Sequence, residues 1–334
     1  MSMNERTIGP TDTIADFGTE PTLHRYAWVC VITTFCLLVW GGLVHATGSS
    51  LACPDWPLCY GQVFPEMQGG VAIEHGHRLL ASLVGVLSIG LLVLVRRSRR
   101  VKTMAATAVL LVVVQGALGG LTVIFRLPPL VSTAHLALGS AFFCLLIAIA
   151  LRIQDGNRSQ TRQSPSRGIV RLASIGTILV YVQLVVGALV RHTSAGLACN
   201  NQVVLCNGAW WPTEPGSGPA MLHMGHRALG LLVALYVTWS AVRAIRSARS
   251  AGRIDLARHA VAGPFLVIAQ IALGMWTVHS FIDASFVTAH LAGAELLLAQ
   301  QWTLKLLAQR PPRIRERHSE RAHPGLGAPL ESCG

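Results

Sequence analysis

The segment VSTAHLALGSAFFCLLIAIALR, residues 131–152, decides the fold class of this chain. It carries no charged side chain before its final arginine, and about 20 mainly apolar residues are what a helix needs to cross roughly 30 Å of hydrocarbon. A histidine such as His135 is costly in a segment of this kind, so it points to a functional site inside a helix bundle. We interpret residues 131–152 as a transmembrane helix.

Seven further segments have the same character, and the composition agrees with them. Hydrophobic residues make up 52% of the 334 residues, charged residues 13% and aromatic residues 6%, which favours closely packed helices in lipid over a β-barrel. The segments are 26–46, 73–95, 103–125, 169–191, 222–243, 260–280 and 285–307. The sequence therefore predicts an all-α membrane protein with eight transmembrane helices.

Two short breaks predict helical hairpins. Pro128 and Pro129 separate the third expected helix from the fourth, and a turn around Asp283 separates the seventh from the eighth. Because proline ends a helix and short connections join antiparallel neighbours, each pair is expected to pack side by side.

The basic residues are distributed unevenly, which predicts the orientation in the membrane. All but four of the 27 Lys and Arg residues lie near the chain ends or in alternate connections, and these residues accumulate in loops on the cytoplasmic side. The exceptions are Arg78, Arg126, Arg191 and Arg227. We expect both termini to be cytoplasmic.

The net charge of +12 arises from these dispersed basic residues. We therefore expect contact with anionic membrane lipid and no nucleic-acid partner, since aromatic side chains are not interleaved with the charges. Residues 1–25 are partly acidic and lack the apolar core of a secretory signal, so a bacterial plasma membrane is the expected location. The Arg-rich residues 308–334 are expected to form a disordered cytoplasmic tail.

The two halves of the chain repeat each other. His77-Arg78 recurs as His226-Arg227, and Thr-Ala-His-Leu recurs after a similar interval. Because a unit of four helices returns to its starting side, the copies form a parallel repeat. We predict two tandem, pseudo-symmetric four-helix bundles. The expected divisions are an N-terminal tail 1–25, a first bundle 26–152, a cytoplasmic linker 153–168, a second bundle 169–307 and a tail 308–334.

Four histidines lie near the outer ends of alternate helices, two in each repeat. They are His77, His135, His226 and His290. Two imidazoles on facing helices can hold a planar haem through its axial positions, whereas two histidines alone underfill a tetrahedral copper or zinc site. We therefore predict one haem iron per repeat. The alternative for any one histidine is a packed polar residue, and recurrence in both halves favours ligation.

Arg78 and Arg227 directly follow two of these histidines, on the side that is poor in basic residues. Haem propionates would supply a counter-charge through charge-assisted hydrogen bonds. Snorkelling of the arginines to lipid headgroups is the alternative.

The outer connections carry two cysteine pairs, Cys53 with Cys59 and Cys199 with Cys206. Oxidising surroundings favour disulfides on that face, although spacing alone does not establish their geometry. A structural staple and a redox or substrate-handling role both remain open.

Glu74 is the main departure from the repeat. It lies three residues before His77, on the same helix face, whereas the equivalent position in the second half is His223. A carboxylate beside an iron can relay protons; the alternative is an interface residue that only pairs with an arginine. The asymmetry predicts a catalytic first half and an electron-storing second half.

Several motifs together resemble the haem A synthase family, from about the first expected helix to the last. They are Trp40-Gly41-Gly42, CPDWPLC at 53–59, EHGHR at 74–78, QGALGG at 115–120 and the two Thr-Ala-His-Leu segments. The resemblance implies oxidation of the C8 methyl group of haem O to a formyl group by successive hydroxylations, which gives haem A for terminal cytochrome oxidases.

The resemblance also implies roles for the histidines. His226 and His290 would ligate a resident haem b, while His77 and His135 with Glu74 would form the haem O site. Both cysteine pairs are present, as in the two-pair members of the family. Implied partners are haem O, molecular oxygen or water, and an electron donor that the sequence does not identify. Haem O synthase, which is a farnesyltransferase, and a second copy of the chain are candidate protein partners.

Two other functions would use the same features. A non-catalytic di-haem cytochrome would need the same four histidines, and only Glu74 argues against it. A thiol–disulfide enzyme built on the loop cysteines would be active without iron.

Overall fold

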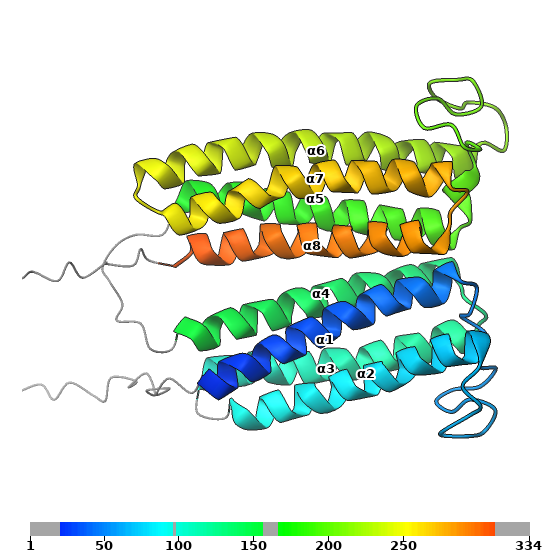
Figure 1. The fold of residues 1–334 in the computed structure, drawn as a ribbon, viewed down its shortest axis with the longest axis horizontal. Coiled ribbons are helices and arrows are strands. Elements are labelled where there is room, and N and C mark those ends of the chain that lie inside the picture. Colours follow the sequence, from blue (N-terminus) through cyan, green and yellow to red (C-terminus); the bar gives the residue numbers. More distant parts are fainter. Residues whose placement is uncertain (1–20, 96–97, 156–165, 311–334) are drawn as a thin grey trace, which may run out of the picture.

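The computed structural model describes residues 21–95, 98–155 and 166–310, and its regular elements in these ranges are helices, with no β-strand among them (Figure 1). The α-helices of these ranges are α1 (Pro21–Ala46), α2 (Gly69–Leu94), α3 (Arg99–Ile124), α4 (Pro129–Asp155), α5 (Arg167–His192), α6 (Gly218–Ser250), α7 (Ile254–His279) and α8 (Ala284–Ala308), with a short 3-10 helix η1 (Ala195–Leu197). The prediction of an all-α chain is confirmed. Most of the two expected tails and of the expected linker lies outside the described residues.

Each predicted helix has its counterpart, and the differences are at the ends. α6 continues to Ser250 and α7 begins already at Ile254, beyond the predicted limits at 243 and 260. The additional turns carry arginines such as Arg246 and Arg249, which are good helix formers and suit the interfacial layer. The apolar stretch of sequence ends at the edge of the hydrocarbon layer, whereas the hydrogen-bonded helix continues beyond it.

Seven of the helices, α1 to α7, are long and apolar enough to cross a membrane, judged over the described residues. The chain is a multi-pass membrane protein. α8 is nearly as long as most of the others but carries the strongly polar or charged side chains of Glu295, Gln300, Gln301 and Lys305. The first three are buried, so α8 turns its polar groups toward the protein, as intramembrane polar residues generally do.

The two predicted hairpin turns share one backbone conformation. Leu127 N donates to Thr122 O at 2.7 Å after α3, and Ile282 N donates to Thr277 O at 2.8 Å after α7. These bonds span five residues, as at a Schellman helix end. Leu127 and Ile282 have φ values of 63° and 60°, a left-handed conformation that is uncommon for such residues. The matching turns bring α3 against α4 and α7 against α8.

The helices gather in two halves, α1–α4 and α5–α8 (Figure 1). In the first half α1 packs against α2, α2 against α3, α3 against α4 and α4 against α1, which places α2 and α4 at opposite corners. The second half repeats this order, with α6 and α8 at opposite corners. α8 also packs against α1 and α4, and α4 packs against α5, so α4 and α8 lie at the junction of the halves.

The start of α1 and the end of α8 lie at the same end of the molecule, on the left in Figure 1, and the loops 47–68 and 193–217 lie at the other. We call the latter the loop end. The even-numbered helices begin there, so His77, His135, His226 and His290 all lie within about two and a half turns of the loop end.

Candidate functional site

The four predicted histidines form two pairs across the corners of the two halves. His77 on α2 lies within electrostatic range of His135 on α4, and His226 on α6 within range of His290 on α8. All four side chains are partly buried. The fold therefore brings together the residues that the repeat had paired, while their role as iron ligands remains a prediction.

Each of these rings lies against a glycine on the preceding helix. A Cβ atom at Gly41 would come within 3.1 Å of His77 Cε1, and one at Gly187 within 2.9 Å of His226 Cε1. The corresponding distances are 3.3 Å from Gly119 to His135 Cε1 and 3.1 Å from Gly274 to His290 Cε1. Real Cβ contacts are rarely so short. A side chain at any of these positions would push the imidazole away, so the glycines fix where each ring stands.

The ring nitrogens of these histidines fit metal coordination. The Nδ1 atoms of His77, His135 and His290 are buried and have no hydrogen-bond partner among the described residues, which is unusual because buried polar atoms are normally satisfied. His226 Nδ1 lies 3.1 Å from Gln183 Nε2. Two imidazoles on opposite corners of a bundle are a suitable donor set for the axial positions of a haem. The residues of both halves therefore fit this group.

Glu74 and Arg78 bind the first outer loop. Arg78 Nη2 donates to Glu74 Oε1 at 2.6 Å, and Arg78 Nη1 donates to the carbonyl oxygens of Asp55 and Leu58. Glu74 Oε2 accepts the backbone N–H of Cys53 at 2.8 Å. Both oxygens of Glu74 are thus engaged. The ion pair with Arg78 is present, while the proton-relay role of Glu74 and the propionate contact of Arg78 stay predictions.

Arg227 has a different environment in the second half. Its Nη1 atom donates to Val203 O at 3.1 Å and more weakly to Leu205 O at 3.4 Å. Its Nη2 atom is buried without a partner among the described residues. The position equivalent to Glu74 holds His223, which brings no negative charge. Arg227 therefore has a buried donor group left for an anionic ligand.

The structure joins both predicted cysteine pairs as disulfides, Cys53–Cys59 and Cys199–Cys206. Each loop then closes with the same backbone pairing, between Cys59 and Gln62 in the first loop and between Cys206 and Ala209 in the second. The two loops differ in the helix side chains that lie next to their disulfides.

The first disulfide has an imidazole beside it. One nitrogen of His75 and the two sulfurs of Cys53 and Cys59 lie within 4.8 Å of one another. His75 Nε2 donates to Val63 O at 2.8 Å, and its buried Nδ1 has no partner in the described part of the chain. The second disulfide instead packs against Met224. In the first half an imidazole thus lies next to the disulfide, whereas a methionine packs against the disulfide of the second half.

Asp55 shapes the tip of the first loop. Its carboxylate accepts the backbone N–H groups of Tyr60 at 2.7 Å and Gly61 at 2.8 Å. These bonds, first of all the one from Gly61, hold the pKa of Asp55 below its ordinary value, with a smaller contribution from the positive charge of Arg78. The neighbouring Trp56 packs on α3, where a Cβ at Gly120 would approach its ring to 2.7 Å. The loop is thus fastened to both α2 and α3.

Comparison with known proteins identifies the family. The family described as cytochrome oxidase assembly protein (COX15-CtaA) matches residues 24–72 and 66–302, which together are most of the chain. The chain belongs to this family.

Individual relatives in this cytochrome oxidase assembly family are similar over most of their length. A protein named heme A synthase from Bacillus licheniformis is 31% identical over 78% of this chain and 88% of its own length. Heme A synthase from Symbiobacterium thermophilum is 33% identical over 71% of this chain and 79% of its own length. The one from Shouchella clausii is 32% identical, with coverages of 78% and 87%.

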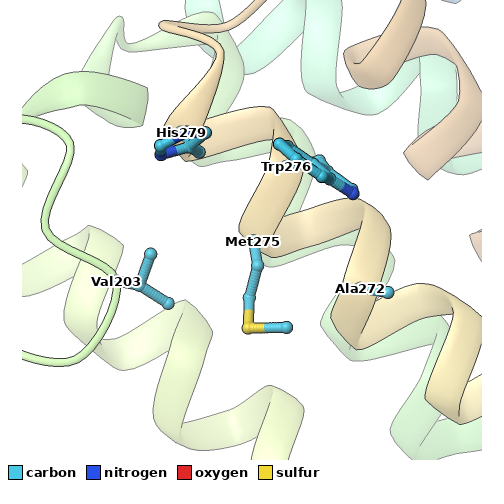
Figure 2. Close-up of a pocket in the computed structure, with 5 residues that line it drawn as sticks. All are labelled: Val203, Ala272, Met275, Trp276 and His279. Carbon is cyan, nitrogen blue, oxygen red and sulfur yellow. The ribbon is translucent and has the colours of Figure 1, made fainter.

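Two pockets of this cytochrome oxidase assembly protein lie at the loop end of the second half. The first, of about 410 Å³, is formed by one face of α7 and by Val203 from the loop opposite (Figure 2). Its α7 residues are Ala272, Met275, Trp276 and His279. The second, of about 360 Å³, lies beside Cys206. The four predicted histidines line neither pocket, so these hollows do not mark the site.

Sequence reasoning missed several residues of the site. His75 entered it only as part of the EHGHR motif, with no role of its own, and Gly41 and Gly187 were not connected with the histidines that they face. A signal existed, since Gly41 and Gly187 occupy equivalent positions in the repeat. The contacts themselves depend on how the helices cross and could not be predicted from spacing.

Proposed function

We propose that this chain is a haem A synthase, which oxidises the C8 methyl group of haem O to a formyl group by successive hydroxylations and so makes haem A for terminal cytochrome oxidases. Its family and its likeness to proteins named heme A synthase support this function. One structural observation carries it: two pairs of histidines stand at opposite corners of the two halves near the loop end, each ring against a glycine.

The proposed architecture has eight transmembrane helices in two tandem, pseudo-symmetric four-helix bundles, 26–152 and 169–307, joined by a cytoplasmic linker 153–168. The matching turns, disulfide loops and glycine–histidine contacts support a duplicated unit. At 25 residues and about 1.5 Å per residue, α8 is long enough to cross the bilayer. Both termini are cytoplasmic, and the haem sites face the outside of a bacterial plasma membrane, because the basic residues avoid the loop end.

In the second half, His226 and His290 are the proposed axial ligands of a resident haem b. Arg227 contributes its free Nη2 donor to a propionate, since a guanidinium pairs well with a carboxylate. Bound there, haem b supplies one-electron redox chemistry. The protein's own contribution is to hold both imidazoles against Gly187 and Gly274 and to keep the ligand's negative charge next to Arg227.

In the first half, His77 and His135 are the proposed holders of haem O, and Glu74 is the proposed general base. Arg78 determines when Glu74 is available. Its guanidinium would bind a substrate propionate in place of Glu74 and so release the carboxylate. Once released from Arg78, Glu74 Oε1 can take up and pass on the protons that the oxygen chemistry beside the substrate requires. Its Oε2 stays held by the N–H of Cys53, so the first disulfide loop positions the carboxylate.

The proposed partners beyond haem O are molecular oxygen or water as the oxygen source and an electron donor. Haem O synthase, a farnesyltransferase, is a proposed protein partner because it would deliver the substrate, and a second copy of the chain is another. Membrane lipid surrounds the exposed apolar faces, such as the one with Leu231, Leu232 and Leu235 on α6. No nucleic-acid partner is proposed.

The test is to supply the purified full-length protein with haem O, a reductant and oxygen and to follow the pigment by pyridine haemochrome spectra. We expect haem A to appear, together with a constant amount of haem b. The control is Glu74→Gln, which keeps the side-chain size but cannot act as a base; it should bind the same pigments and make little haem A.

Other outcomes point to the rival functions. If haem O remains unchanged while a quinol is oxidised, the protein is a di-haem cytochrome and the proposal is wrong. A colourless preparation that exchanges thiols and disulfides would favour the thiol–disulfide enzyme.

A further inference from the structure

A carboxyl group is buried at the junction of the two halves. Glu295 on α8 has no exposed surface, and its Oε1 atom accepts a hydrogen bond of 2.6 Å from Ser140 Oγ on α4. Its other oxygen, Oε2, is buried and has no partner among the residues that the structure describes. An ionised carboxylate in such surroundings is costly unless a positive charge compensates it. Burial therefore favours the protonated, neutral form of Glu295 in the chain alone.

The hydrogen bonds of Ser140 allow both protonation states. Its hydroxyl has one hydrogen but two contacts, Leu136 O at 3.0 Å and Glu295 Oε1 at 2.6 Å. If Glu295 is protonated, it donates to Ser140, which donates to Leu136. If Glu295 is ionised, Ser140 turns its hydrogen to the carboxylate. The pair can thus gain or lose a proton without a change in the backbone.

The two residues of this pair lie at the same distance in sequence from the predicted histidine of their own half. Ser140 lies five residues after His135 on α4, and Glu295 lies five residues after His290 on α8. The two are therefore equivalent positions of the repeat that face each other, with a serine in one copy and a glutamate in the other. At about 1.5 Å per residue, the backbone of Ser140 and that of Glu295 each lie roughly 7.5 Å further along the helix than the histidine of the same helix.

Other titratable groups near Glu295 are few. Cys144 on α4 and Tyr181 on α5 lie within electrostatic range of it, and Lys305 of α8 lies within range of Cys144. Tyr181 donates its hydroxyl hydrogen to Ala137 O at 2.9 Å. Thiols and phenols are ordinarily neutral near pH 7. Glu295 is accordingly the group of this cluster whose charge can follow a change between the two halves.

We infer that Glu295 is a proton-binding site shared by the two haem sites, which holds a proton when the haem beside it is reduced and releases it when that haem is oxidised. The inference rests on the proposed function in that it needs haem at the histidine pairs. A ferric haem carries one more positive charge than a ferrous one, and in a medium of low dielectric this charge stabilises the carboxylate of Glu295.

The step balances in charge. One electron from an external reductant, dithionite in the test below, reduces ferric to ferrous haem. The added negative charge is offset by one proton from the solvent, which binds to the carboxylate of Glu295 and forms its carboxyl O–H. Oxidation reverses both transfers.

The test uses the full chain with haem b bound and measures the haem midpoint potential by dithionite titration between pH 5 and pH 9. In the wild type we expect the potential to fall as pH rises, because proton uptake accompanies reduction. In Glu295→Gln that dependence should be lost or strongly reduced. Cys144→Ala and Tyr181→Phe are matched controls and should keep the wild-type slope, as should Lys305→Gln.

Infrared difference spectra between the reduced and oxidised protein give a second readout. They can be recorded for any variant that folds. A carboxyl C=O band should appear on reduction in the wild type and be absent from Glu295→Gln. If that variant does not fold, Ser140→Ala should shift the band, since it removes the hydrogen-bond partner.

The outcomes separate this inference from the proposed function. Unchanged slopes in Glu295→Gln, or an unshifted band in Ser140→Ala, would overturn the proton site even if haem is bound and haem A is formed. Failure of the wild type to bind haem at all would overturn the proposed function first.

Discussion

At the scale of single residues, the site depends on side chains that touch a glycine. His226 fits at its corner because Gly187 has no Cβ, and the same holds for His77 against Gly41. A histidine held in this way cannot turn freely, which reduces the entropy lost when it binds a metal. The four contacts therefore preorganise the imidazoles.

The proposed ligand role of His226 can be tested directly. Replacing His226 with alanine removes one of two axial imidazoles, so we expect the low-spin bis-histidine spectrum of the second half to disappear in optical and electron paramagnetic resonance measurements. His279→Ala is the control, because His279 is an exposed histidine near the loop end of the same half. An unaltered spectrum in His226→Ala would show that the pair is a packed polar feature only.

The sequence allowed the four histidines to be predicted but not their surroundings. Their recurrence in the repeat is visible in the sequence alone. The bond from Arg78 to Glu74 and the burial of Glu295 depend instead on which helix faces turn inward. In lipid both faces of a helix are apolar, so periodicity does not distinguish them. Glu295 is visible in the sequence as an ionisable residue within the last expected helix, but the sequence does not show that it faces Ser140.

At the scale of elements, α8 is the helix whose place is least evident from its composition. Its polar side chains lower its hydropathy, yet they are buried against the protein rather than exposed to lipid. The helix limits could be predicted to within a turn or two, since apolar length sets the span and the turn residues set its ends. The interfacial extensions of α6 and α7 could not, because their residues are polar.

The crossing of the membrane by α8 predicts a labelling pattern. Cysteine introduced at Ser285, an exposed residue at the start of α8, should react in intact cells with a membrane-impermeant maleimide. Cysteine introduced at Gln309, exposed just after its end, should react only after the membrane is opened. The protein without either substitution provides the background. Labelling of both positions from the same side would mean that α8 does not span.

At the scale of the whole molecule, two similar halves carry different chemistry at equivalent places. The first has His75 beside its disulfide and Glu74 bound to Arg78, where the second has Met224 and His223. The scaffold could be predicted as a repeat because its loops and helices match. The proposed division of labour rests on contacts that the two halves do not share.

The two disulfides should therefore respond differently to removal. Each closes a short loop, so Cys53→Ser with Cys59→Ser and Cys199→Ser with Cys206→Ser should each cost ~2 kcal/mol of stability, seen as similar shifts in thermal unfolding. Formation of haem A should fall much further in the first double variant, because Cys53 holds Glu74. Equal losses of activity in both variants would contradict a positioning role for the first loop.

The burial of α4 has one more consequence. It is the most buried of the seven apolar helices, and it packs against α1 and α3 on one side and against α5 and α8 on the other. A pigment that displaces α4 when it binds at His135 must also displace the contacts of α4 with α5 and α8 in the second half. We therefore expect occupancy of one half to alter the affinity of the other, so that uptake of pigment by the empty protein would be cooperative.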